Sequence, residues 1–269
     1  SKPDEISTKN AQSALKYFLK NIFRKESFLP GQIELVNNCF RRKNILGILP
    51  ATGGKTIAYQ LASMLQPGLA IIINPLSSLV VQQIEELKKA RIDIVGKLIA
   101  SENSKSIHTK QIKKIKAQAY SMLYISPENL RNSETRKALS TSADYNINFS
   151  YFIIDEVHCL SEWSHDFKLT YHKLGDLKDL IIKNKNKQKI STIALSSTVS
   201  NASQNDILSE LMIEPEDVVK INRQTSNIKI KIIEIAANQP QTEMSSEEIR
   251  ERIGRQKQIH SSFLINEIF

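Results

Sequence analysis

The segment 50–56 most constrains how this chain can fold, because it reads Pro-Ala-Thr-Gly-Gly-Lys-Thr and directly follows the apolar run 44–49. It opens an amphipathic stretch in which Ile57, Leu61 and Leu65 recur at helical spacing. A strand that turns through glycines into a helix directs backbone N–H groups, a helix N-terminus and a lysine toward one point. The segment therefore predicts a strand–loop–helix unit that binds phosphate.

A second apolar run, 151–154, ends in the carboxylates Asp155 and Glu156. A buried strand delivers such a pair to the edge of a parallel sheet, where one carboxylate holds Mg²⁺ through water and the other orients an attacking water. We therefore expect Asp155 and the Thr56 hydroxyl to hold Mg²⁺, Lys55 to pair with the β- and γ-phosphates, and Glu156 to act as the base. The expected cofactors are ATP and Mg²⁺.

Strand-like runs alternate with helical patterns along most of the chain. The expected strands lie near 44–49, 69–74, 92–99, 121–125, 151–155, 190–196, 217–221 and 228–235. Alternation of this kind predicts right-handed βαβ units. The expected class is therefore an α/β fold, a RecA-like P-loop domain with a mainly parallel sheet covered by helices on both faces.

Composition excludes some classes of protein and favours others. The 269 residues are 41% apolar, enough for a real core, but we find no run of about 20 apolar residues that could span a membrane. Cys39 and Cys159 have no partner at metal-ligand spacing, so we expect reduced thiols in a cytoplasmic or nuclear protein without a secretion signal. The net charge of +9 is a weak indication of a polyanionic partner.

Several motifs give the chain a specific resemblance to RecQ-like DNA helicases of superfamily 2. Asp-Glu-x-His followed by Cys-Leu-Ser-x-Trp-x-His-Asp-Phe resembles motif II and the aromatic-rich loop of that family. Other segments occur in the family's order: 28–32 (motif 0), 74–83 (motif Ia), 124–128 (motif Ib), 195–198 (motif III) and 223–228, the strand that leaves the first motor domain. The resemblance covers roughly residues 14 to 235.

The resemblance assigns further residues to the nucleotide site. It implies that Gln32 reads the adenine edge with its amide. The phosphate loop would comprise Thr52, Gly53 and Gly54 together with Lys55 and Thr56. His158 would act beside the catalytic carboxylates and couple them to motif III. That coupling would run through Ser197 and Thr198, although a buried histidine in the core is an alternative.

The resemblance also implies a path for nucleic acid. Ser77, Ser78 and Gln82 would donate to phosphates, as would Ser126 and Arg131 on the next loop. The aromatic-rich loop would present Trp163, His165 and Phe167 to nucleobases. The basic residues between Lys105 and Lys116 either extend this path or form a solvated face.

Some positions depart from the family pattern. Lys25 stands where an aromatic ring usually stacks on adenine, and Leu29 replaces an arginine. Thr52 carries a Cβ where the phosphate loop usually has a third glycine, so a left-handed backbone there would be strained. These changes predict weak binding of ATP.

We therefore expect residues 1–235 to form the first RecA-like motor domain of an ATP-dependent DNA helicase. Residues 236–269 would form a linker and a helix leading to a second RecA-like domain that supplies arginine fingers. The expected activity is 3′–5′ translocation on single-stranded DNA with unwinding at duplex junctions. Three alternatives stay open: a nucleic-acid-binding adaptor without turnover, another superfamily 2 translocase, and a P-loop small-molecule kinase.

Overall fold

The computed structural model describes residues 8–98, 105–140, 147–159 and 190–221. Their strands form one seven-stranded sheet in the order β3-β4-β2-β5-β6-β1-β7, and all neighbouring strands run parallel. The strands are β1 (Ile45–Ile48), β2 (Leu69–Ile73), β3 (Val95–Leu98), β4 (Met122–Ile125), β5 (Phe149–Ile154), β6 (Ser191–Ser196) and β7 (Val218–Lys220).

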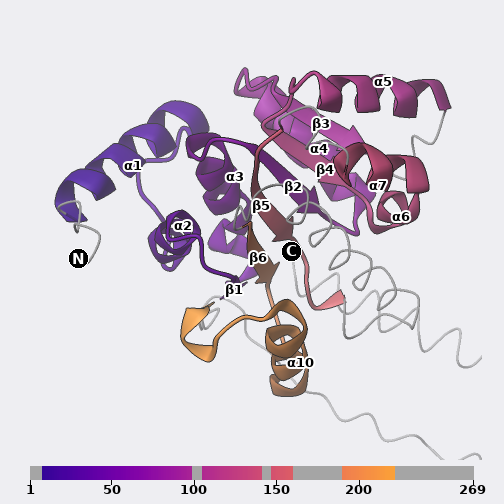
Figure 1. Ribbon diagram of the computed structural model, residues 1–269. Coiled ribbons are helices and arrows are strands. Elements are labelled where there is room, and N and C mark those ends of the chain that lie inside the picture. Colours follow the sequence, from indigo (N-terminus) through magenta and orange to yellow (C-terminus); the bar gives the residue numbers. More distant parts are fainter. Residues whose placement is uncertain (1–7, 99–104, 141–146, 160–189, 222–269) are drawn as a thin grey trace, which may run out of the picture. The chain divides into compact units, whose positions relative to one another are not determined.

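The helices lie on both faces of this sheet (Figure 1). They are α1 (Thr8–Phe23), α2 (Gln32–Phe40), α3 (Lys55–Leu65), α4 (Ser77–Lys89), α5 (Lys105–Lys116), α6 (Pro127–Arg131), α7 (Ser133–Ser140) and α10 (Asn201–Leu211). Short 3-10 turns cover Ala51–Gly53 and Pro215–Asp217. Among the helices described, none combines the length and hydrophobicity that a membrane crossing requires.

Strand β5 shows why the strands are almost continuously apolar. Phe152 and Ile154 belong to a core shared with α5, α6, α7 and α10, whereas Tyr151 and Ile153 belong to a core shared with α1, α2, α3 and α4. Consecutive residues of a strand point to opposite faces, so a strand covered on both sides favours apolar residues on both faces. The expected parallel α/β sheet with helices on both faces is confirmed.

Seven of the eight expected strands occur; six are shortened by one to four residues, and β5 begins two residues before the expected 151 and ends one residue before 155. The expected strand 92–99 is shortened most, because only Val95–Leu98 pairs with β4. The eighth expected strand, 228–235, lies outside the described residues, as does the expected domain boundary after residue 235.

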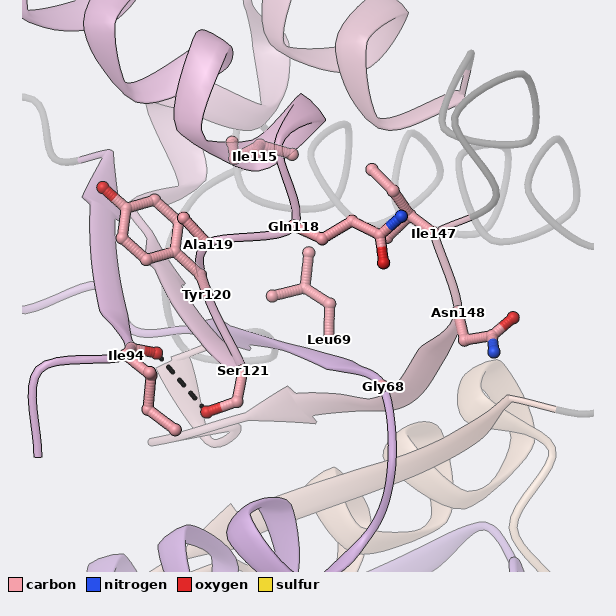
Figure 2. Close-up of a pocket in the computed structure, with 10 residues that line it drawn as sticks. All are labelled: Gly68, Leu69, Ile94, Ile115, Gln118, Ala119, Tyr120, Ser121, Ile147 and Asn148. Carbon is pink, nitrogen blue, oxygen red and sulfur yellow. Dashed lines mark hydrogen bonds between the residues drawn. The ribbon is translucent and has the colours of Figure 1, made fainter.

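A pocket of about 290 Å³ opens at the amino-terminal edge of the sheet (Figure 2). Its wall includes Gly68, Ser121 and Asn148, each of which comes directly before a strand. Gly68 has a φ of 118°, and a Cβ there would lie 3.0 Å from the Asn148 carbonyl oxygen, so only glycine fits this crossing of two chain segments. Ligands of open parallel sheets bind at the opposite, carboxyl-terminal edge, where every expected nucleotide-binding residue lies.

Candidate functional site

The phosphate loop follows β1 as a right-handed 3-10 turn over Ala51–Gly53, and Gly54 then leads into α3. Gly54 has a left-handed φ of 67°, which a residue with a Cβ adopts only with strain. Thr52 is exposed and lies inside the right-handed turn. The threonine that replaces the family's third glycine therefore causes no left-handed strain.

Lys55 lies at the start of α3 and is 6% exposed. Its Nζ donates to the carbonyl oxygen of Leu49, 3.3 Å away, at the end of β1. Its charge also lowers the pKa of Asp155, so the ammonium group and the carboxylate act on each other. The fold thus brings together two residues that are a hundred positions apart in the sequence.

Asp155 follows β5 and is 4% exposed. Its two carboxylate oxygens accept hydrogen bonds from Asn74 Nδ2 and from the backbone N–H of Glu156, each at 3.1 Å. Burial raises its pKa from 3.8 to about 6, and the charge of Glu156 raises it as well, whereas Lys55 and a hydrogen bond from Gln83 lower it. A carboxylate that ionises at such cost gains from a cation beside it.

Glu156 has a left-handed φ of 53°. Such a backbone costs a residue with a Cβ roughly 1–2 kcal/mol, and strain of this kind is concentrated at functional sites. Its Oε2 is buried and accepts no hydrogen bond within the described part of the chain, although His158 Nδ1 lies 3.4 Å away. The oxygen is therefore available to accept a hydrogen bond from a water molecule.

His158 Nδ1 lies 2.8 Å from the hydroxyl of Ser196, the last residue of β6. The Ser196 hydroxyl donates its only proton to the carbonyl oxygen of Thr198, at 2.8 Å, so the imidazole must donate from Nδ1. The expected coupling to Ser197 and Thr198 is therefore shifted: the contact runs through Ser196. Sequence reasoning missed this serine because it also completes an apolar strand.

Gln32 is 2% exposed, and both ends of its amide are engaged. Its Oε1 accepts from the Leu29 N–H at 2.7 Å, and its Nε2 donates to the Gly54 carbonyl oxygen at 2.8 Å. One N–H and one lone pair remain for an adenine. In this conformation the side chain joins motif 0 to the phosphate loop, a role that the sequence did not reveal.

A pocket of about 460 Å³ adjoins Thr56. Its wall includes Ile57 and Gln60 of α3, and the cationic residues Arg24, Lys25, Lys89 and Arg91 line it together with Glu86. Lys25, which stands where the family has an aromatic ring, therefore gives the pocket a charged wall in place of a stacking surface. An anionic ligand suits such a pocket.

A chain of buried and half-buried polar groups lies behind Thr56. Gln83 Nε2 donates to Thr56 Oγ1 at 3.3 Å, and the Tyr59 hydroxyl donates to Gln83 Oε1 at 3.0 Å. The Tyr124 hydroxyl accepts from Gln60 Nε2 at 2.9 Å and lies 3.5 Å from that of Tyr59. Burial raises the pKa of Tyr59 well above its ordinary value and that of Tyr124 to about 12, so both hydroxyls keep their protons at neutral pH.

Sequence reasoning assigned Gln82 to the nucleic-acid path, which stays a prediction, and gave no separate role to the adjacent Gln83. Gln82 is exposed and bonds to Glu86 at 3.1 Å, whereas Gln83 points toward the nucleotide site. The signal was present, because Val80, Ile84 and Leu87 mark the buried face of α4 and Gln83 lies on that side.

The expected nucleic-acid residues are only partly placed. Ser77 and Ser78 form the first turn of α4 at the carboxyl end of β2, and Ser78 is exposed. Ser126 is wrong as a direct phosphate contact in this conformation, because it is 0% exposed and its Oγ accepts from Asn129 at 3.2 Å. A serine before a short helix turns its hydroxyl inward to bond that helix.

Other expected contacts lie beyond what the structure describes. Arg131 ends α6, but its side chain is outside the described part of the structure. Trp163, His165 and Phe167 also fall outside the described residues. These four assignments stay predictions.

Comparisons with known proteins identify the family to which the chain belongs. The sequence profile of the DEAD/DEAH box helicase family matches residues 29–207. ATP-dependent DNA helicase Q1 of Rattus norvegicus is 31% identical over 74% of this chain and 31% of its own length. ATP-dependent DNA helicase RecQ of Bacillus subtilis is 30% identical over 83% of this chain and 35% of its own length.

A solved structure shows the same fold at lower identity. The chain of the DUF1998 helicase MrfA, crystallised bound to DNA, superposes with a TM-score of 0.60 and 18% identity over 77% of this chain and 29% of its own. The present chain thus spans about a third of the length of the relatives named here. The expected resemblance is confirmed, and the chain belongs to the DEAD/DEAH box helicase family, with RecQ-like DNA helicases among its relatives.

Proposed function

We propose that this chain is the ATP-binding motor domain of a RecQ-like, ATP-dependent DNA helicase. The observation that carries the proposal is the placement of Lys55, at the start of α3 after β1, and of the buried Asp155, directly after β5, at the carboxyl edge of one parallel sheet, where the lysine lowers the pKa of the aspartate. A P-loop lysine beside a strand-end aspartate is the minimum that binding of a nucleotide with its metal requires.

The residues present fit Mg²⁺. Thr56 Oγ1 and the Asp155 carboxylate are hard oxygen donors, and among the described residues no cluster of three or more His, Cys, Asp or Glu side chains forms a complete metal cage. Mg²⁺ commonly binds through one or two such groups together with the phosphates of its nucleotide. When bound, it would neutralise charge on the phosphates.

The remaining chemistry belongs to the protein. Lys55 would leave the Leu49 carbonyl oxygen and pair with the phosphates. The uncommitted Glu156 Oε2 would accept a hydrogen bond from the attacking water and orient it. His158, whose Nδ1 bonds Ser196 and lies 3.4 Å from Glu156 Oε2, would link the catalytic carboxylate to motif III, so that motif III responds to the nucleotide.

DNA would bind along the same edge of the sheet. The N–H groups of the first turn of α4, with Ser77 and Ser78, would contact backbone phosphates. The aromatic loop with Trp163 would stack on bases. We further propose translocation in the 3′–5′ direction, junction unwinding, and arginine fingers from a second RecA-like domain, all on the basis of the resemblance to RecQ-like helicases.

Unwinding by the protein that carries this chain tests the proposal. A duplex with a 3′ single-stranded tail should be opened in the presence of Mg²⁺ and ATP, and a duplex with a 5′ tail should not. Glu156→Gln, which keeps the size of the side chain and removes the base, should bind ATP and DNA but fail to hydrolyse or unwind.

The adaptor without turnover remains the second candidate, because Gln32 is engaged internally and Lys25 removes the stacking surface. Tight binding of DNA without ATP hydrolysis, in the wild type as well as in Glu156→Gln, would favour the adaptor and contradict the motor.

A further inference from the structure

The hydrogen bonds behind Thr56 all run in one direction. Gln60 donates to Tyr124, and Tyr59 donates to the carbonyl oxygen of Gln83. The amide nitrogen of Gln83 then donates to Thr56 Oγ1 at 3.3 Å, and Gln83 lies close enough to the Asp155 carboxylate to lower its pKa. The chain of donors therefore ends on the two residues that would hold Mg²⁺.

The orientation of the Gln83 amide follows from this arrangement. An amide has a donor end and an acceptor end, and Tyr59 occupies the acceptor end with its hydroxyl proton. The donor end must then face Thr56 and Asp155, which are both acceptors there. If the amide were reversed, its NH2 group would meet the Tyr59 hydroxyl and its oxygen would face the Asp155 carboxylate, so repulsion at Asp155 and the donated proton of Tyr59 together favour the observed rotamer.

Gln83 is carried by α4, the helix that would meet DNA at its first turn. Ser77 and Ser78 begin the helix, and Gln83 lies less than two turns further along. Val80 and Ile84, on the buried side of the same helix, pack into the core. A displacement of α4 by a nucleic acid would therefore move the Gln83 amide relative to the two metal-binding residues.

We propose that Gln83, oriented by Tyr59, is a positioning residue that holds Thr56 and Asp155 for Mg²⁺ and makes metal binding respond to nucleic acid on α4. This inference rests on the proposed function, because it concerns the same nucleotide site. It adds a route from DNA to the metal that does not pass through the aromatic loop.

Binding of a fluorescent ATP analogue by the 269-residue chain tests the proposal, measured in EDTA and over a Mg²⁺ titration. Gln83→Met keeps the volume of the side chain and removes its hydrogen bonds. We expect its Mg²⁺ affinity to fall by roughly 10-fold or more, as for other groups that hold metal ligands in place, while nucleotide affinity in EDTA stays within about twofold. Tyr59→Phe, which deletes one hydroxyl, should show the same pattern more weakly.

The chain offers a matched control on another helix. Gln111 of α5 also accepts a hydrogen bond from a tyrosine, with the Tyr120 hydroxyl 2.5 Å from its Oε1, but it lies away from the nucleotide site. Gln111→Met and Tyr120→Phe should leave Mg²⁺ affinity unchanged. Loss of a glutamine–tyrosine bond therefore would not by itself explain the effect.

The coupling is measured by repeating the Mg²⁺ titration with saturating single-stranded DNA. DNA should change the Mg²⁺ affinity of the wild type and leave that of Gln83→Met unchanged, although both bind DNA equally well without nucleotide. Equal Mg²⁺ affinity and equal DNA response in the wild type, Gln83→Met and Tyr59→Phe would overturn this inference alone. A wild type whose nucleotide binding ignores Mg²⁺ would overturn the proposed function as well.

Discussion

Replacement of Asp155 by asparagine should make the folded chain less sensitive to rising pH. Asp155 is buried, and its pKa of about 6 lies above the ordinary value of 3.8. A group whose pKa is raised by folding stabilises the fold below 3.8, and this contribution is lost as the pH rises through 6. At neutral pH the wild type therefore carries an ionised buried carboxylate that lowers its stability.

The size of the effect follows from linkage. With pKa values of 3.8 unfolded and about 6 folded, the contribution of Asp155 to the free energy of unfolding should fall by ~1.4 kcal/mol between pH 5 and pH 8. Asp155→Asn removes the ionisable group, so this position no longer makes the free energy of unfolding depend on pH. Any constant cost from its rearranged hydrogen bonds to Asn74 and Glu156 cancels when the two pH values are compared.

Urea denaturation in EDTA, at pH 5 and pH 8, measures this difference. The free energy of unfolding of Asp155→Asn minus that of the wild type should be ~1.4 kcal/mol higher at pH 8 than at pH 5, so the variant gains relative stability. A relative stability that does not change with pH would refute the reasoning, because it would mean that Asp155 ionises in the folded chain as easily as in water.

Three further outcomes are expected. Gly54→Ala should lower the free energy of unfolding by ~1–3 kcal/mol in urea denaturation, since its φ is 67° and a Cβ would lie 2.3 Å from Gln32 Nε2; unchanged stability would contradict this backbone geometry. The 269-residue chain alone should hydrolyse ATP very slowly even with DNA, because the arginine fingers, which contribute ~10³–10⁵ in rate, are expected to come from a second RecA-like domain. A turnover of several per second would contradict that expectation. In the protein that carries this chain, Trp163→Ala should leave basal ATPase unchanged but reduce its stimulation by single-stranded DNA about tenfold; retained stimulation in a variant that merely unfolds earlier would show that the ring packs in the core.

The sequence predicted the strands and the carboxyl-edge site because both depend on local pattern. Continuous apolar runs indicated strands buried on both faces; Asp155 follows one such run directly, and Lys55 follows another after the loop 50–54. Parallel strands bring their carboxyl ends to one edge, so the meeting of these two residues needed no knowledge of the strand order.

The partners of polar side chains were harder to predict, because they depend on strand order and on rotamers. β6 lies between β5 and β1, which places Ser196 within reach of His158. The inward turn of Ser126 and the bonds of Gln32 to the phosphate loop likewise depend on neighbours that are not adjacent in sequence. Motif matching identifies a side chain but not the direction in which it points.

Binding of ATP to the 269-residue chain tests the central claim most directly. Isothermal titration with Mg²⁺ present should give one site, and either EDTA or Lys55→Ala should weaken the binding by at least ~10-fold. Circular dichroism should show that Lys55→Ala keeps the helical content of the wild type. Equal affinity for ATP in the wild type and Lys55→Ala would contradict the account, because it would place the nucleotide away from the phosphate loop.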